Sequence, residues 1–240
     1  MQQPSGDIIQ ASEETASRKD SHLDLALQSR NENTDSRFYY EPMMAVHPGK
    51  DDSWEVSFGN KRMRFPIWIS SMTGGTVRTN EVNNRLAHSA ARFGLGMGVG
   101  SARIAVEDTS REKDFNLRPI LGDEIPFYLN FGIAQVEKFL KNKEVYKLKN
   151  LRNKLNADGF IIHVNPLQEW MQPEGDIIKT PPIITIRRFI NEAPDIPLIV
   201  KEVGQGFGPE SMKALIELPL AAIEFAAAGG TNFSKVELLR

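Results

Sequence analysis

Four polar side chains with the chemistry of a catalytic site lie close together between residues 163 and 169. His163 and Asn165 follow the apolar run 160–162, two residues apart, and Gln168 and Glu169 come just after them. Alternate residues of a strand face the same side of a sheet, so His163 and Asn165 are expected to share one face. Such groups can move a proton or bind phosphate, and the Glu169 carboxylate is a suitable ligand for Mg²⁺. The plain alternative is a polar loop with a structural histidine.

Two glycine-containing segments have the composition to approach an anion or a cofactor closely. In SSMTGGTVRTNE, Gly74 and Gly75 precede an expected helix start, whose free N–H groups favour an anion or an electron-rich cofactor edge. In GMGVGSARIA, Ser101 and Arg103 alternate on one face, and arginine can bind phosphate through two parallel hydrogen bonds. An ordinary turn and a surface arginine are the respective alternatives.

A lysine in an apolar strand and a second glycine pair add to this set. Lys201 stands in PLIVKEVG, where a buried charge must be compensated, so it is expected to face an anionic ring or a developing charge. A Gly-Gly pair followed by Thr231 and Asn232 resembles an anion-binding helix start, and Glu237 lies on the helix that follows. A solvated position is the alternative for Glu237.

The segment SRKDSH places three potential cations, Arg18, Lys19 and His22, at an expected helix start near Ser17. Such a group can clamp a diphosphate by folding over the mouth of a site, and a solvated basic patch is the alternative. Residues 1–17 are polar and rich in Ser, Gln and Glu, so we expect them to form a mobile tail.

The elements that must position these residues recur with a spacing of about 30 residues, the length of a βαβ step. Helical patterns separate short apolar runs, which lie at 67–72, 96–100, 127–131, 160–164, 197–203 and 221–226. This alternation indicates an α/β fold with a parallel sheet. Polar residues follow each run, at the strand ends where a (β/α)8 TIM barrel builds its active site, so we favour a barrel over an open doubly wound sheet. Six units are present, and residues 18–240 are expected to form a single barrel domain without the last two.

The composition excludes several classes of protein. The 240 residues carry 29 basic and 31 acidic side chains, and a formal charge of −2 gives no sign of a nucleic-acid partner. The chain has no cysteine, which excludes disulfides and thiolate chemistry. We see no targeting segment and no apolar stretch long enough to span a membrane, and we expect a cytoplasmic protein. The serine-hydrolase elbow, the P-loop and the HExxH zinc motif are absent from the sequence.

These segments together resemble one enzyme family. The motifs SRKDSH, MTGG, MGVGSAR, NFG, HVNPLQEWMQPEGD, PLIVKEVGQG and GGTNFSKVELLR occur in the order and spacing of type 2 isopentenyl-diphosphate delta-isomerase, over residues 17–240. The resemblance implies a (β/α)8 barrel that binds FMN and Mg²⁺. It implies that the enzyme interconverts isopentenyl diphosphate and dimethylallyl diphosphate in isoprenoid biosynthesis, with the flavin reduced by NADPH.

The resemblance also implies roles for individual residues. For the diphosphate substrate they are Arg18, Lys19, His22, Ser101, Arg103, Asn165 and Gln168. For the flavin they are Ser71, Met72, Thr73, Ser101, Asn130, Lys201 and Thr231. Gln168, His163 and Glu237 are expected to take part in proton transfer, and Glu169 is expected to bind the metal.

The sequence departs from this family in two places. Residues 226–228 are three alanines where the family usually has glycine or small polar residues, which is expected to crowd a backbone contact to the flavin. The last two strand units, with the loops that bind the flavin phosphate, are not present, so we expect low stability and low activity from this chain alone. The alternatives are an inactive barrel remnant that binds a phosphorylated ligand and another FMN-dependent barrel oxidoreductase. We expect a homo-oligomer.

Overall fold

The computed structural model describes residues 41–227 and 230–240, and the chain divides into a unit that ends at Asp52 and a unit from Ser53 to Arg240. The segment 1–17 and the three cations at positions 18, 19 and 22 lie outside the described residues. In the first unit, residues 41–52 contain turns and no helix or strand. All the elements below belong to the second unit.

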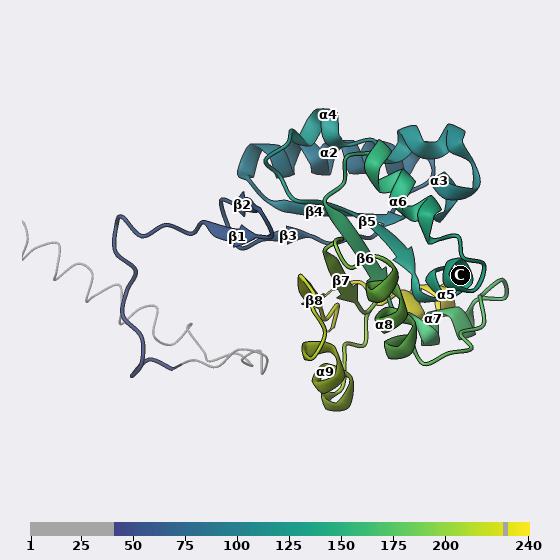
Figure 1. The fold of residues 1–240 in the computed structure, drawn as a ribbon. Coiled ribbons are helices and arrows are strands. Elements are labelled where there is room, and N and C mark those ends of the chain that lie inside the picture. The colour runs from purple at the N-terminus through teal and green to yellow at the C-terminus, as the bar shows by residue number, and fades with distance from the viewer. Residues whose placement is uncertain (1–40, 228–229) are drawn as a thin grey trace, which may run out of the picture. The chain divides into compact units, whose positions relative to one another are not determined.

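Six parallel strands form one sheet, in which each strand pairs with the next one along the chain (Figure 1). They are β3 (Trp68–Ile69), β4 (Gly96–Ser101), β5 (Phe127–Gly132), β6 (Gly159–His163), β7 (Leu198–Lys201) and β8 (Ala222–Glu224). Each strand lies within or overlaps one of the predicted apolar runs, which confirms the α/β fold with six βα units. A separate antiparallel hairpin, β1 (Val56–Phe58) and β2 (Lys61–Met63), precedes the sheet and turns at Gly59, whose φ is 62°.

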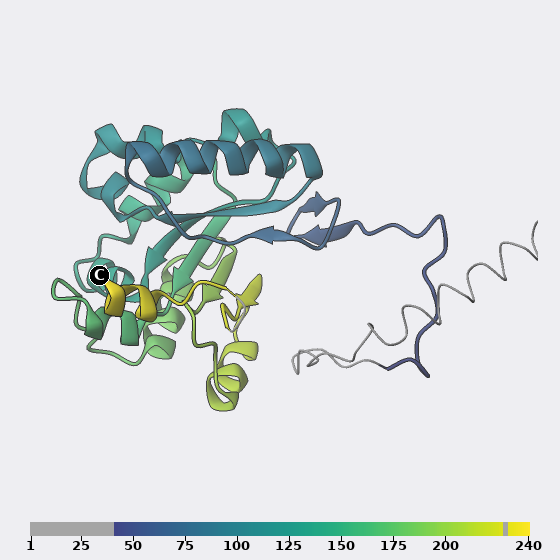
Figure 2. The same ribbon diagram turned by 180° about the vertical axis from the view of Figure 1, so that it is seen from behind.

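Helices fill the connections between the strands. They are α2 (Val77–Phe93), α3 (Arg103–Glu107), the 3₁₀ helix η1 (Thr109–Phe115), α4 (Arg118–Leu121), α5 (Ile133–Lys141), α6 (Val145–Lys154), α7 (Pro166–Met171), α8 (Pro182–Glu192), α9 (Pro209–Ile216) and α10 (Phe233–Leu239). In Figure 1, α2, α4 and α6 cover β4 and β5, whereas α9 lies beside β8. Viewed from behind in Figure 2, the yellow α10 returns to the strand ends, where it contacts α7.

Local signals in the sequence explain where α2 begins and ends. Thr76 caps its start, because the Thr76 hydroxyl accepts a hydrogen bond from the Thr79 backbone N–H and the Thr79 hydroxyl accepts one from the Thr76 N–H. Gly94 ends the helix with a φ of 68°, a left-handed conformation that suits glycine. The chain between β5 and β6 forms two helices, α5 and α6, because Lys143 lies between them with a φ of 58°.

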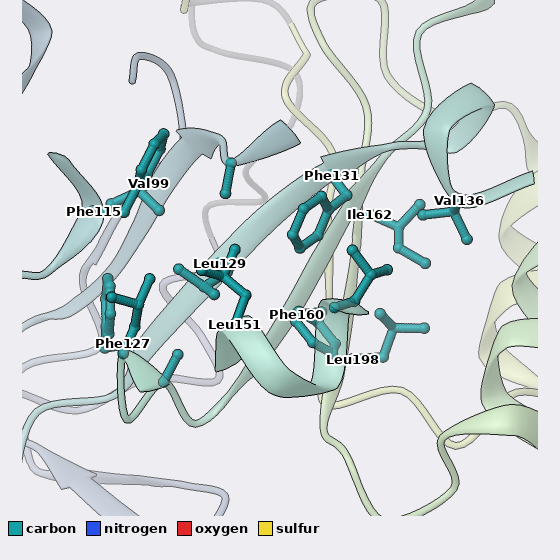
Figure 3. Close-up of a cluster of buried hydrophobic side chains, with 14 of the residues drawn as sticks. Val99, Phe115, Phe127, Leu129, Phe131, Val136, Leu151, Phe160, Ile162 and Leu198 are labelled. Carbon is teal, nitrogen blue, oxygen red and sulfur yellow. The ribbon is translucent and has the colours of Figure 1, made fainter. Parts of the chain in front are cut away.

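The outer face of the sheet carries the main core, because the strands alternate large apolar side chains toward the helices (Figure 3). Phe127, Leu129 and Phe131 of β5 are at most 1% exposed, and Phe160 and Ile162 of β6 join them. Burying one such side chain is worth about 1.5–3 kcal/mol. This packing fixes the strands whose ends carry the polar residues.

The inner face holds a smaller aromatic cluster. Tyr128, Ile161 and Ile199 are buried there, and Trp68 and Phe58 pack against them. The Trp68 ring centroid lies 5.1 Å from that of Phe58 and 5.5 Å from that of Tyr128. Phe58 comes from the β1–β2 hairpin, so the hairpin supplies part of the filling of the curved sheet.

Candidate active site

A cavity of about 140 Å³ lies at the carboxyl ends of the strands. It gathers residues from six separate parts of the chain, and its lining comprises Ser71, Met72, Gly100, Ser101, Asn130, His163, Gln168, Lys201, Val203 and Phe233. Seven of the predicted site residues therefore meet in one place. The parallel sheet explains why, since the carboxyl ends of parallel strands come together at the same edge.

A short chain of hydrogen bonds runs across the floor of this cavity from β6 to the end of β3. Asn130 donates from its amide nitrogen to the Ser71 hydroxyl at 2.6 Å, so its amide oxygen is free to accept from His163 Nδ1 at 2.5 Å. The Asn130 orientation thus puts the proton of a neutral His163 on Nδ1 and leaves Nε2 as an acceptor. Burial, with a smaller effect from the Lys201 charge, lowers the pKa of His163 to about 3. The imidazole is therefore neutral at physiological pH.

Lys201 places a buried amino group beside this chain of hydrogen bonds. The side chain is 3% exposed, and its Nζ donates to the Glu202 carbonyl oxygen at 2.7 Å. Burial lowers the pKa of Lys201, while the charges of Glu224 and Glu202 act in the opposite direction. The group can stabilise negative charge in a ligand that enters the cavity.

Hydrogen bonds to a backbone carbonyl hold the loop after β3 in place. The Thr73 carbonyl accepts from the Gly100 N–H at 2.8 Å and from the Asn83 side chain at 3.0 Å, and Thr73 itself does not line the cavity. A Cβ atom at Gly100 would lie 2.3 Å from the Thr73 carbonyl carbon, so position 100 has room only for glycine. The glycines of β4 thus serve close packing of the Thr73 loop against the strand.

Two glutamines from α7 hold the Glu237 carboxylate of α10. Glu237 Oε1 accepts from Gln168 Nε2 at 3.1 Å and from Gln172 Nε2 at 2.6 Å. The Glu237 side chain is 8% exposed, and an Arg240 nitrogen lies 3.7 Å from its other oxygen. The Glu237 carboxylate is therefore hydrogen-bonded to Gln168, which lines the cavity, although Glu237 itself does not line it.

Asn165 and Glu169 are buried behind the cavity and do not line it. The strand ends at His163, and Asn165 directly precedes α7 with a φ of −135° and a ψ of 47°, so the alternation of the strand does not extend to Asn165. The Asn165 amide donates to Glu169 Oε1 at 3.0 Å, and the Asp176 backbone N–H donates to Glu169 Oε2 at 2.7 Å. Among residues 41–227 and 230–240, no three His, Asp or Glu side chains form a group able to hold a metal ion.

Three of the predicted residues, Arg103, Met72 and Thr231, are partly or largely exposed. Arg103 pairs with Glu107 at 3.0 Å and with Asp176 at 3.3 Å, about half exposed, so its guanidinium is on the surface. Met72 is 49% exposed although it contributes to the cavity lining, and Thr231 is exposed and does not line it.

A larger cavity, of about 510 Å³, lies away from these polar groups between α8 and α9. Val200 lines it, whereas the adjacent Lys201 lines the smaller cavity, as strand alternation requires. Its lining is predominantly apolar, so we place the chemistry in the smaller cavity. In the part of the chain that the structure describes, no helix has the length and apolar content needed to cross a lipid bilayer.

Sequence reasoning missed Gln172 and Glu224. Gln172 lies four residues after Gln168, and that spacing places two residues on one helix face, so the signal was available. Glu224 pairs in register with Lys201 on the neighbouring strand, and strand pairing is not visible in a single sequence.

Comparison with known proteins gives two sets of matches, although no family model matches the chain. An isopentenyl-diphosphate delta-isomerase of Pseudescherichia vulneris is 35% identical over 232 residues, which is 94% of this chain and 65% of that protein. The protein of the same name from Rickettsia africae is 34% identical over 229 residues, 93% of this chain and again 65% of the relative. The chain thus spans 65% of the length of these curated relatives.

The similar solved structures are more distant. A mandelate oxidase variant with a monooxide FMN adduct aligns with a TM-score of 0.47 at 11% identity, covering 75% of this chain and 52% of that one. A putative lactate oxidase from Pediococcus acidilactici aligns with a TM-score of 0.49 at 12% identity, covering 72% and 50%.

Proposed function

We propose that the chain belongs to the family of isopentenyl-diphosphate delta-isomerases and that its residues serve an enzyme which interconverts isopentenyl and dimethylallyl diphosphate. The observation that carries the proposal is the cavity at the strand ends, where Lys201, His163 and Gln168 converge. These are residues of the segments that resemble the family in sequence.

The reaction explains the kind of site that is needed. Moving the double bond requires one proton to be added at one carbon and another removed nearby, and no carbonyl acidifies either carbon. Protonation of an alkene develops positive charge, so the site must exclude water and hold an electron-rich group against that charge. A bound reduced FMN would supply this electron density.

The chemistry of the cavity suits a flavin. A buried ammonium on Lys201, the Asn130 amide and the hydroxyls of Ser71 and Ser101 are donors for the electron-rich edge of a flavin ring. We propose that these residues hold FMN together with Met72, Thr73 and Thr231. His163 offers Nε2 as an acceptor toward the substrate, with no charge of its own that would repel a cationic transition state.

We assign proton handling to the pair Gln168 and Glu237. The carboxylate accepts the Gln168 amide at 3.1 Å, which holds it beside the cavity, so a proton lost by the substrate can reach Glu237 through a water molecule next to Gln168. Gln172 fixes the same carboxylate oxygen. Replacing Gln172 with leucine is therefore expected to lower kcat more than it changes KM, and steady-state kinetics with the exposed variant Lys235→Ala as control measure this. A kcat equal to that of the control would refute the assignment.

We propose that Arg103, Asn165 and the cations Arg18, Lys19 and His22 bind the diphosphate, and that Glu169 binds Mg²⁺. One carboxylate can suffice for Mg²⁺ when phosphate oxygens and water complete the coordination. Both Glu169 oxygens already accept a hydrogen bond, so the metal must use their remaining lone pairs. Cytoplasmic location, homo-oligomeric assembly and NADPH as the reductant stay predictions.

Proton NMR of isopentenyl diphosphate in D₂O tests the proposal directly. The chain is incubated with FMN, NADPH and Mg²⁺, and each component is left out in turn. We expect deuterated dimethylallyl diphosphate, and we expect it to disappear when flavin, reductant or metal is omitted. A folded chain that gives no product would contradict isomerase activity of this chain by itself. Net oxidation of a substrate would favour a flavin oxidoreductase instead.

A further inference from the structure

The only direct hydrogen bond of the buried Lys201 side chain within the described residues goes to an uncharged group. Its Nζ donates to a neutral backbone carbonyl, that of Glu202, at 2.7 Å, and the side chain is almost fully buried. An isolated ammonium in such a place loses its proton unless a nearby negative charge compensates it. The counter-charge must therefore come from a carboxylate that faces the same side of the sheet.

The carboxylate of Glu202 is committed elsewhere. Its Oε2 accepts the backbone N–H groups of residues 204, 205 and 206 at 2.6, 2.6 and 2.9 Å. Glu202 also lines the apolar cavity between α8 and α9, on the side of the sheet opposite to Lys201. Three backbone donors already satisfy this charge, so Glu202 is the weaker candidate.

Glu224 has the position that Glu202 lacks. It is the register partner of Lys201 on β8, and register partners of neighbouring strands project to the same face. The pair two residues earlier, Ile199 and Ala222, belongs to the inner cluster, which puts Lys201 and Glu224 on the inner side as well. The Ser70 hydroxyl, at the end of β3, donates to Glu224 Oε1 and fixes the carboxylate from across the curved sheet.

The second oxygen of Glu224 supports the same conclusion. Oε2 is buried and has no hydrogen-bond partner among the residues that the structure describes. An unpartnered buried carboxylate oxygen costs free energy unless a positive charge lies near enough to compensate it. On the other side of Lys201, its β6 register partner His163 is neutral, so it neither competes for Glu224 nor balances the ammonium.

We propose that Glu224 is the counter-charge of Lys201 and a positioning residue of the site, which keeps the Lys201 side chain an ammonium inside the cavity. The two groups form no direct ion pair within the described residues, so Glu224 acts through the low-dielectric interior of the sheet. The use of this ammonium toward a flavin rests on the proposed function, whereas the pairing itself does not.

The test is an NMR titration of the Lys201 side chain in protein labelled with ¹³C- and ¹⁵N-lysine, with the signal assigned by its loss in Lys201→Gln. Glu224→Gln keeps the volume and the Ser70 hydrogen bond but removes the charge. We expect the titration midpoint of Lys201 to fall by about one pH unit or more, a tenfold change in its protonation constant. Glu217→Gln removes the same charge from an exposed position of the chain and is expected to leave the midpoint unchanged.

Glu224→Asp serves as the second variant should Glu224→Gln fail to fold, and it is expected to lower the midpoint by a smaller amount. A folded Glu224 variant in which Lys201 titrates as in the unaltered chain would overturn the proposal. The measurement needs neither flavin nor substrate. A chain that shows the shift but has no isomerase activity would therefore refute the proposed function and leave the pairing intact.

Discussion

The neutral, buried His163 makes a specific prediction about stability in acid. Its pKa lies at about 3 in the folded chain, against an ordinary value of 6.5. Because the folded value is depressed, the unfolded state binds more protons between these limits, and stability falls as the pH drops below 6.5. Proton linkage gives a loss of about 2 kcal/mol between pH 8 and pH 5 from this one residue. The figure barely changes for any folded value below about 4, so it depends chiefly on the unfolded state.

Urea unfolding at the two pH values isolates this contribution when the chain is compared with His163→Gln. Glutamine can still donate an amide N–H to Asn130, but it cannot take up a proton. We expect the loss of unfolding free energy from pH 8 to pH 5 to be about 2 kcal/mol smaller in the variant. His88→Gln removes an exposed histidine from α2 and should leave the loss as it is in the unaltered chain.

Equal losses in His163→Gln and in the unaltered chain would refute the reasoning. They would mean that the imidazole takes up a proton in the folded state about as readily as in the unfolded one. The hydrogen bond from Nδ1 to Asn130 would then not keep Nε2 a neutral acceptor. The proposed role of His163 as a hydrogen-bond acceptor for the substrate would also be refuted.

Three further substitutions test the packing and backbone geometry of the second unit. Ala226→Gly is expected to raise the unfolding free energy by about 1 kcal/mol in urea, because a φ of 44° strains an L-residue. The control Ala214→Gly, inside α9, should lower the unfolding free energy by about as much. The same change in both variants would contradict the strain at Ala226. Gly100→Ala is expected to cost about 1–3 kcal/mol in thermal unfolding, because its Cβ meets Thr73, and an unchanged midpoint would contradict the clash. Arg118→Ala should cost about 3 kcal/mol or more in urea, since Arg118 is buried against three carbonyls and a carboxylate, and a loss below about 1 kcal/mol would contradict this.

The strands were predictable from the sequence because both faces of a parallel sheet are covered. Strands of this kind appear as short, mainly apolar runs, as 127–131 and 160–164 do. The position of each run then predicts where its strand ends. The position of Lys201 in the cavity was predictable for the same reason, since a lysine in an apolar run must face a polar interior. Because successive residues of a strand face opposite sides of the sheet, Lys201 lines the smaller cavity and Val200 the larger one.

The parts that were not predictable depend on where an element stops. Asn165 was expected beside His163, but the strand ends at His163 and Asn165 directly precedes the helix α7. The sequence shows Pro166 after Asn165, which permits either outcome. The bond between Gln172 and Glu237 joins α7 to α10 over 65 residues, and a contact at that separation leaves no local pattern.

The hydrogen bond between Ser70 and Glu224 has a consequence for the order of folding. Each strand pairs with its sequence neighbour, so the sheet can grow from local βα units, but this bond joins residues 154 positions apart. Closing a loop of that length costs about 1.5 kcal/mol more entropy than closing one of roughly 30 residues, so we expect it to form after the neighbouring strands have paired. Amide hydrogens of β8 should then exchange faster than those of β5 and β6. The Glu224 carboxylate therefore reaches its position near Lys201 only after the other strands have paired. The charge balance of the site is thus established late in folding.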